Sequence, residues 1–189
     1  MKTIWIAIAA ISFTAAIAGA AETTKADRAR LDQIQKSLSA DVPRVLCLDE
    51  NFTTGAQPTR EAYAKAAATG FHAVLSLRTA SEGIDLARER AQVESNKMRY
   101  FNIPVNGASP RVEQADEFLR LTRDKSNHPM LINCASANRV GAFMMILRVV
   151  DQGWSEDKAL DEAIKIGLSS DGLKKFAKEY IATDPPKRP

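Results

Sequence analysis

The chain has 189 residues, with 26 lysines and arginines against 23 aspartates and glutamates and a net charge of +3. This near balance, without a basic stripe, argues against a protein that binds nucleic acid. The two histidines, His72 and His128, have no cysteine or carboxylate at ligand spacing, so we expect no metal site and no cofactor. The length suits one domain with a hydrophobic core.

Residues 1–20 have the pattern of a secretory signal peptide. Lys2 provides a positive start, residues 4–18 are mostly apolar, and Ala18-Gly19-Ala20 offers a cleavage site of small residues. The apolar stretch is rich in alanine and therefore weakly hydrophobic for a membrane anchor, so an uncleaved anchor is the less favoured alternative. We expect cleavage, no stable membrane insertion afterwards, and a periplasmic or secreted protein.

The segment that follows, residues 21–43, predicts a polar N-terminal arm or helix with a thin apolar stripe. Strand and helix patterns alternate after it. The expected strands are 45–48, 52–54, 72–77, 99–105 and 129–133, and the expected helices are 59–68, 84–96, 110–123, 138–150, one that starts at 154–155, and 173–182. Ser109 should cap the third of these helices, with Pro110 at its first position.

This alternation predicts one α/β domain over residues 44–183, with a central, largely parallel sheet of four to five strands flanked by helices. A flexible tail is expected at 184–189. Ligands of such sheets bind beyond the carboxyl ends of the strands. Arg78, the loop at 105–108 and the loop at 134–139 all stand at such ends, so we expect them to converge on one pocket.

The loop that begins at Cys134 gives the strongest indication of chemistry. An apolar run ends at this cysteine, four small or polar residues follow, and Arg139 opens a long apolar helix. Backbone N–H groups in such a loop, together with the helix N-terminus, cradle an oxyanion, and the same field favours a thiolate. Arg139 adds a planar fork that suits two phosphate oxygens. Phosphate is therefore the expected ligand.

These patterns define the candidate site. Cys134 is the expected nucleophile and Arg139 the oxyanion clamp. Four residues are expected to hold the phosphate, mainly through backbone N–H groups: Ala135, Ser136, Ala137 and Asn138. Arg78 either lines the pocket or pairs with a carboxylate. Glu82 and Asp85 precede a helix, where acids favour the helix dipole, so we expect capping roles for them.

Four segments occur in an order typical of one group of enzymes. They are Phe52-Thr53-Thr54-Gly55-Ala56-Gln57-Pro58-Thr59, Val74-Leu75-Ser76-Leu77-Arg78, Ile103-Pro104-Val105, and residues 134–141. With them the chain resembles the cysteine-dependent dual-specificity and tyrosine phosphatase superfamily, and most closely the bacterial beta-lactamase-hydrolase-like phosphatase domain family. The resemblance implies that Cys134 attacks phosphorus, that the loop and Arg139 hold the oxygens, and that water hydrolyses the phosphocysteine. It also implies a phosphorylated protein or small molecule as substrate.

The chain departs from the superfamily pattern at four points. Four residues, rather than the usual five, separate Cys134 from Arg139. The usual loop glycine is Ala137, which disfavours a left-handed backbone, and the usual hydroxyl residue after the arginine is Val140. Asn106 stands where a general acid often follows Ile-Pro, so the general acid is unknown. A slow enzyme and a catalytically weak phosphate- or anion-binding module therefore stay open.

Two further alternatives concern the cysteines. A rhodanese-type sulfurtransferase also has a cysteine loop of this shorter length, although the chain lacks the Gly-His that precedes Ile-Pro in that family. In an oxidising compartment, Cys47 could form a disulfide with Cys134 and switch its activity. The other interpretation is that Cys47 is a buried core thiol that points away from the site.

Overall fold

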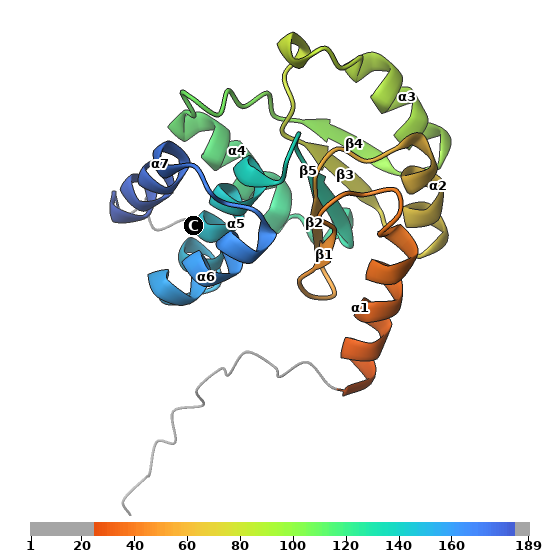
Figure 1. Ribbon diagram of the computed structural model, residues 1–189, viewed down its shortest axis with the longest axis horizontal. Helices are drawn as coiled ribbons and strands as arrows, with labels where there is room; N and C mark the ends of the chain where they lie inside the picture. Colours follow the sequence, from red (N-terminus) through yellow and green to blue (C-terminus); the bar gives the residue numbers. More distant parts are fainter. Residues whose placement is uncertain (1–24, 184–189) are drawn as a thin grey trace, which may run out of the picture.

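Five short strands form one sheet in the order β1-β2-β5-β3-β4 in the computed structural model, which describes residues 25–183 (Figure 1). β1 runs antiparallel to β2, and the other neighbouring strands are parallel. The strands are β1 (Leu46–Cys47), β2 (Phe52–Gly55), β3 (Ala73–Ser76), β4 (Arg99–Asn102) and β5 (Met130–Asn133). The predicted, largely parallel sheet is confirmed. The predicted signal peptide and the tail at 184–189 lie outside the described residues.

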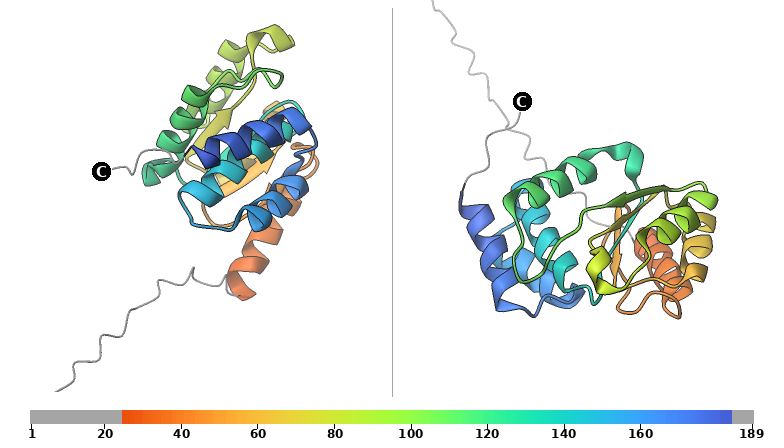
Figure 2. Two further views of the ribbon diagram at one scale, coloured as in Figure 1. Left: turned by 90° about the vertical axis from the view of Figure 1, so that its left-hand side faces the viewer. Right: turned by 90° about the horizontal axis from the view of Figure 1, so that it is seen from above.

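Helices cover both faces of this sheet, as predicted. Figure 2 shows α1, α2 and α3 on one side of the sheet and α4 to α7 on the other. The α-helices are α1 (Lys25–Leu38), α2 (Arg60–Ala68), α3 (Leu86–Ser95), α4 (Val112–Arg123), α5 (Asn138–Val150), α6 (Glu156–Ile166) and α7 (Asp171–Ala182). The expected capping role of Asp85 is confirmed, because its carboxylate accepts from the Arg88 N–H at the start of α3.

The strands supply alternate side chains to two cores, since successive side chains of a strand point to opposite faces. Met130 and Ile132 of β5, and Cys134 just after it, pack in the core under α4 to α7, whereas Leu131 packs in the core under α1 to α3. Every residue of β2, β3 and β5 is buried, as expected for strands covered on both faces. This alternation turns Cys134 toward the layer that contains α5.

Helix α4 begins later than the sequence predicts. Its N-cap is Arg111 rather than Ser109. Gln114 closes this cap, because its Oε1 accepts from the Arg111 N–H at 2.9 Å while its Nε2 donates to the Pro104 carbonyl at 2.7 Å. Ser109 lies in a turn instead, where its N–H donates to the Asn106 carbonyl at 3.0 Å. The hydrogen bonds of Gln114 and of Ser109 together hold the loop after β4 in place.

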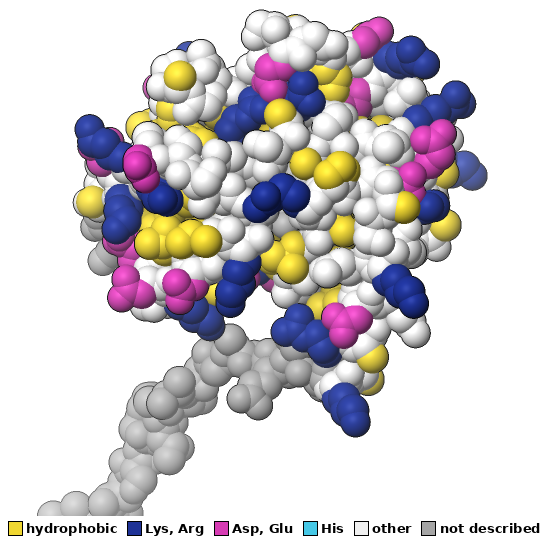
Figure 3. Space-filling model, in the orientation of Figure 1, with side chains coloured by type: hydrophobic (Ala, Val, Ile, Leu, Met, Phe, Trp, Pro, Cys, Tyr) yellow, Lys and Arg dark blue, Asp and Glu magenta, His cyan; other side chains and the backbone are white. Residues whose placement is uncertain are grey.

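Charges of both signs are interspersed on the face drawn in Figure 3, where basic side chains lie among acidic ones. Surface ion pairs among the described residues include Arg120 with Glu117 at 2.6 Å and Lys178 with Glu156 at 2.9 Å. This face therefore presents no continuous basic track. Within residues 25–183, no helix is long and apolar enough to cross a membrane.

Helix α5 is the central helix that the sequence predicts, and residues 139–148 are all buried. Gly141 lets α5 approach the end of α6 closely. A Cβ at this position would lie 2.7 Å from the Ala163 carbonyl oxygen and 2.8 Å from the Leu168 Cβ. Because Gly141 lies in the first turn of α5, this contact fixes the start of the helix and the loop that precedes it.

Gly141→Ala should lower the free energy of unfolding by about 1–3 kcal/mol, because the added methyl group must displace the backbone of α6. Gly172→Ala in the exposed first turn of α7 is the matched control. Its added methyl group meets nothing nearer than 3.7 Å, and alanine should stabilise the helix there by about 0.5 kcal/mol. Urea unfolding of the two variants measures both changes. Equal effects would contradict the close contact at Gly141.

Candidate active site

The last residue of the loop between β5 and α5 has a left-handed backbone conformation. Ala137 has φ 66° and ψ 0° and is the N-cap of α5, and its carbonyl accepts from the Gly141 N–H at 2.9 Å. This conformation costs a residue with a Cβ about 1–2 kcal/mol. The loop therefore makes the left-handed turn at Ala137 despite the Cβ that disfavours it.

Asn138 fastens this loop to the connection between α6 and α7. Its side-chain oxygen accepts from the Ser169 and Ser170 N–H groups at 3.1 and 3.3 Å, and its side-chain nitrogen donates to the Ser169 hydroxyl at 3.1 Å. The sequence predicts a backbone role for Asn138, and the structure adds this role of its side chain. The helices that follow the loop therefore help to position it.

Arg139 reaches from the loop toward the ends of β3 and β4. Its Nη1 donates to the carbonyls of Leu77 and Val105 at 2.9 and 2.7 Å. The carboxylate of Glu82 accepts from both Nη1 and Nη2, each at 2.7 Å. The residue is 8% exposed. Its Nε donates to none of these oxygens, and the guanidinium also interacts with the side chain of Cys134.

The carboxylate of Glu82 accepts hydrogen bonds from Arg139 and from the Thr79 N–H. Glu82 ends the short 3-10 helix η1 (Ala80–Glu82), where it forms a capping box with Thr79, so it caps η1 and not the following helix α3 as predicted. The hydrogen bonds from Arg139, opposed by burial, lower the pKa of Glu82 to about 2. Burial alone would lower the pKa of Arg139, but Glu82 and the Cys134 thiol raise it above its ordinary value. Glu82 and Arg139 therefore form an ionised pair at neutral pH.

Arg78 pairs with a carboxylate, which is one of its two expected roles. Its Nε lies 2.7 Å from Glu82 Oε2, and its Nη1 donates to Gln57 Oε1 at 2.9 Å. It is not among the residues that line the hollow beside Arg139. A contact between Arg78 and phosphate stays a prediction, and the geometry places Arg78 as a support of Glu82.

The buried carboxylate of Glu89 binds and orients the side chain of Gln57. Its Oε1 accepts from Gln57 Nε2 and from the Tyr63 hydroxyl, both at 2.7 Å, and its Oε2 accepts from the Tyr100 hydroxyl at 2.5 Å. Burial and the charge of Glu89 raise the pKa of both phenols. A chain of hydrogen bonds thus runs from Glu89 through Gln57 and Arg78 to Glu82.

A hollow of about 370 Å³ opens beside Arg139. Hydroxyl and amide side chains make up much of its lining: Thr79, Ser81, Ser136, Ser170, Asn106 and Asn138. Of the described residues that line it, Glu82 alone is a carboxylic acid, and its lowered pKa keeps it ionised. Asn106 occupies the place where the resemblance puts a general acid. The general acid therefore stays unassigned.

Cys47 and Cys134 are both free and both buried. Cys47 pairs with Thr53 of β2, which pairs in turn with Leu131 of β5, so two strand spacings and an offset along β5 separate the cysteines. With strands about 4.8 Å apart, that separation is about 10 Å or more, beyond the roughly 6 Å between Cα atoms of a disulfide. The Thr53 hydroxyl donates to Cys47 Sγ at 3.2 Å, and burial raises the pKa of the Cys47 thiol. The hypothesis of a disulfide switch is therefore wrong, and Cys47 is a core thiol.

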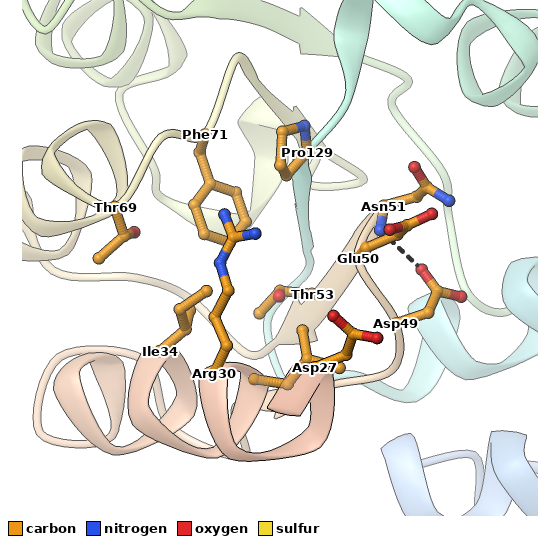
Figure 4. Close-up of a pocket in the computed structure, with 11 residues that line it drawn as sticks. Asp27, Arg30, Ile34, Asp49, Glu50, Asn51, Thr53, Thr69, Phe71 and Pro129 are labelled. Carbon is orange, nitrogen blue, oxygen red and sulfur yellow. Dashed lines mark hydrogen bonds between the residues drawn. The ribbon is translucent and has the colours of Figure 1, made fainter. Parts of the chain in front are cut away.

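A second hollow, of about 240 Å³, lies at the opposite end of the strands (Figure 4). Phe71, Pro129 and Ile34 give it apolar walls, and Arg30 extends from α1 toward Phe71. Asp49 at its edge is bound to Arg148 at 2.7 Å. None of the described residues that line it is a predicted site residue. Three of the predicted site residues, Ser136, Asn138 and Arg139, line the hollow beside Arg139 instead, and Cys134 is not among the described residues that line it.

The model of the family described as "DSP-PTPase phosphatase fused to NAD+ Kinase" matches residues 24–182. No curated protein sequence matches the chain.

Several solved structures share the fold. Tk-PTP in its active form is 21% identical, with a TM-score of 0.64 over 74% of this chain and 97% of that one. TpbA of P. aeruginosa in complex with pTyr is 18% identical, with a TM-score of 0.60 over 75% and 90%. The core catalytic domain of the PP-IP phosphatase SIW14 from S. cerevisiae, in complex with citrate, is 16% identical, with a TM-score of 0.63 over 74% and 88%. At these identities the likeness establishes a common fold.

Glu82→Gln should destabilise the protein by about 1–3 kcal/mol at neutral pH, because it leaves the buried guanidinium of Arg139 without its counter-charge. A carboxyl group with a lowered folded pKa stabilises the protein above its unfolded pKa, and this contribution is lost as the pH falls through the folded pKa. The deficit of Glu82→Gln should therefore be full above 4.5 and shrink as the pH falls toward 2.

Urea unfolding at a series of pH values measures this deficit. Glu113→Gln is the control, because Glu113 is exposed in the first turn of α4, and its substitution should change stability little across the range. A deficit of Glu82→Gln that does not change between neutral and acidic pH would contradict the ionised pair.

Proposed function

The chain belongs to the family of dual-specificity phosphatase domains whose model is described as fused to NAD+ kinase, and we propose that this phosphatase hydrolyses phosphate monoesters through a phosphocysteine intermediate. One observation supports the mechanism above the others. Cys134 and Arg139 stand at the two ends of one loop, and Arg139 is anchored by two carbonyls while it interacts with the Cys134 side chain. A thiol and an anchored guanidinium in this arrangement suit an attack on a bound phosphoryl group.

The reaction proceeds in two displacements. The Cys134 thiolate attacks phosphorus, so that an S–P bond forms as the P–O bond to the leaving group breaks. The backbone N–H groups of residues 135–138 and the guanidinium of Arg139 hold the other phosphoryl oxygens. Water then attacks phosphorus, the S–P bond breaks, and inorganic phosphate and the thiolate are released.

The identity of the proton donor decides which substrates react quickly. Asn106 carries no acidic proton, and Glu82 is ionised at neutral pH. A missing general acid costs about 10²–10⁴-fold in rate when the leaving group is a poor one. A phenolate leaves without a proton more readily than an alkoxide does. Aryl phosphates are therefore the substrates of choice for testing the activity.

Cys134→Ser should reduce phosphate release from p-nitrophenyl phosphate by at least about 10³-fold, because the hydroxyl is a far weaker nucleophile than the thiolate. Cys47→Ser is the matched control, a second buried cysteine distant from the loop, and it should keep most of the activity. Arg139→Lys should weaken both phosphate binding and turnover, because a point charge does not replace the fork. Steady-state kinetics and binding of inorganic phosphate measure these effects.

The same variants separate the two alternative functions. A sulfurtransferase would transfer sulfur from thiosulfate to cyanide in a Cys134-dependent way and would release no phosphate. A binding module would bind phosphate through Arg139 without turnover. Wild-type turnover by Cys134→Ser would refute the assignment of the nucleophile.

We also propose that residues 1–20 direct export of the protein, to the periplasm or out of the cell, and are removed after Ala20. The support is the sequence pattern of a charged start, an apolar stretch and a small-residue cleavage site. Expression of the full chain in a bacterium, followed by fractionation and intact-mass measurement, should find a periplasmic or secreted form that begins at Ala21. A cytoplasmic protein that retains residues 1–20 would refute the proposal.

A further inference from the structure

A second arginine lies over the proposed catalytic loop. Gly167 follows α6 with φ 146°, and a Cβ built on it would lie 3.1 Å from Arg44 Nε, 3.2 Å from Arg44 Nη2 and 3.2 Å from the Ala137 Cβ. The guanidinium of Arg44 and the loop residue Ala137 therefore meet at the same small space. Gly167 makes room for both because it has no side chain.

The backbone at Arg44 has an uncommon conformation, and hydrogen bonds of the neighbouring residues fix it. Arg44 has φ 57°, a left-handed conformation that residues with a side chain rarely adopt. Its neighbours are fixed, because the Pro43 carbonyl accepts from the Ala56 N–H at 2.8 Å and the Val45 N–H donates to the Val42 carbonyl at 3.2 Å. An unfavourable conformation persists where surrounding contacts determine it, and such positions cluster at functional sites.

Arg44 also differs from Arg78 and Arg139 because no carboxylate among residues 25–183 pairs with it. Arg78 and Arg139 both pair with Glu82. Arg44 is exposed, and its guanidinium makes no hydrogen bond or ion pair with any residue in the described part of the chain. An uncompensated positive charge therefore stands at the edge of the loop.

The two arginines Arg44 and Arg139 flank the loop from different sides. β5, which leads into the loop, lies between β2 and β3 in the sheet. Arg139 binds carbonyls beyond the ends of β3 and β4, whereas the segment of Arg44 packs at the end of β2, since a Cβ on Gly55 would meet Val42 and the Pro43 carbonyl. Arg44 thus lies near the loop on the β2 side, outside the hollow beside Arg139, and it lines a separate hollow of about 460 Å³.

We propose that Arg44 binds a second oxyanion of the substrate, so that the protein prefers esters that carry a second phosphate group beside the one that it hydrolyses. This inference rests on the proposed function, because it assumes that the loop of Cys134 and Arg139 holds the first phosphate. A planar guanidinium forms two parallel hydrogen bonds with a phosphate, which suits Arg44 to this role.

Binding to the Cys134→Ser variant tests the preference without turnover. The ligands are phenyl phosphate, with one phosphate group, and the three phenylene bisphosphates, with the second group ortho, meta or para. Calorimetry should find that the best bisphosphate binds about tenfold more tightly than phenyl phosphate. Adding Arg44→Gln should bring the ratio of the two dissociation constants close to unity. Thermal unfolding checks that the variant remains folded.

Arg28→Gln is the matched control for the loss of one positive charge. Arg28 is exposed in the first turn of α1, whose residues Asp27 and Arg30 line the hollow at the opposite end of the strands. Adding it to Cys134→Ser should leave the bisphosphate advantage intact. An advantage that survives Arg44→Gln, that falls equally with Arg28→Gln, or that is absent for all three bisphosphates would overturn the inference.

A different result would refute the proposed function. Wild-type protein that releases no phosphate from phenyl phosphate or from any bisphosphate would refute hydrolysis. If the bisphosphates still bind more tightly in a manner that depends on Arg44, the assignment of Arg44 stands for a binding site without catalysis.

Discussion

The guanidinium of Arg139 joins parts of the site that come from distant segments of the chain. Its hydrogen bonds reach the carbonyls just after β3 and β4, and Glu82 adds a bidentate pair from the segment before α3. A buried cation requires such partners, because an unpaired charge in the interior is strongly destabilising. Arg139 also lies in the first turn of α5, so its anchor fixes how the loop after β5 meets the helix. The left-handed turn at Ala137 and the side-chain bonds of Asn138 complete that geometry.

Much of the fold could be predicted because its cause is local. The apolar runs that become β3 and β5 are buried on both faces, and α5 is apolar nearly all round, as its central place requires. Boundaries were less predictable. The expected strand at 99–105 ends at Asn102, shortly before Pro104, which has no N–H to donate to a strand partner. α4 starts where Gln114 caps it while binding the Pro104 carbonyl, a bond that no local pattern displays.

The site was predictable where its residues lie close together in the sequence. Cys134 and Arg139 could be identified because a strand, a short loop and a helix follow one another. The pairing of Arg139 with Glu82 spans 57 positions, and an acid before a helix equally indicates a cap, so the sequence alone does not select this partner. The separation of Cys47 from Cys134 follows from the strand order, in which β2 lies between β1 and β5. Arg44 lies near the loop because Gly167, which follows α6, leaves room for its guanidinium. The position of Gly167 depends on how α6 packs.

We propose that Cys134 becomes phosphorylated in a loop whose shape Arg139 maintains. The most direct test is rapid acid quenching of wild-type protein during turnover of an aryl phosphate, followed by peptide mass spectrometry. We expect one phosphoryl group on the peptide that contains Cys134, located on the cysteine, and none on Ser136 or Ser169. A phosphoryl group on either serine, or steady turnover without any modified Cys134, would contradict it.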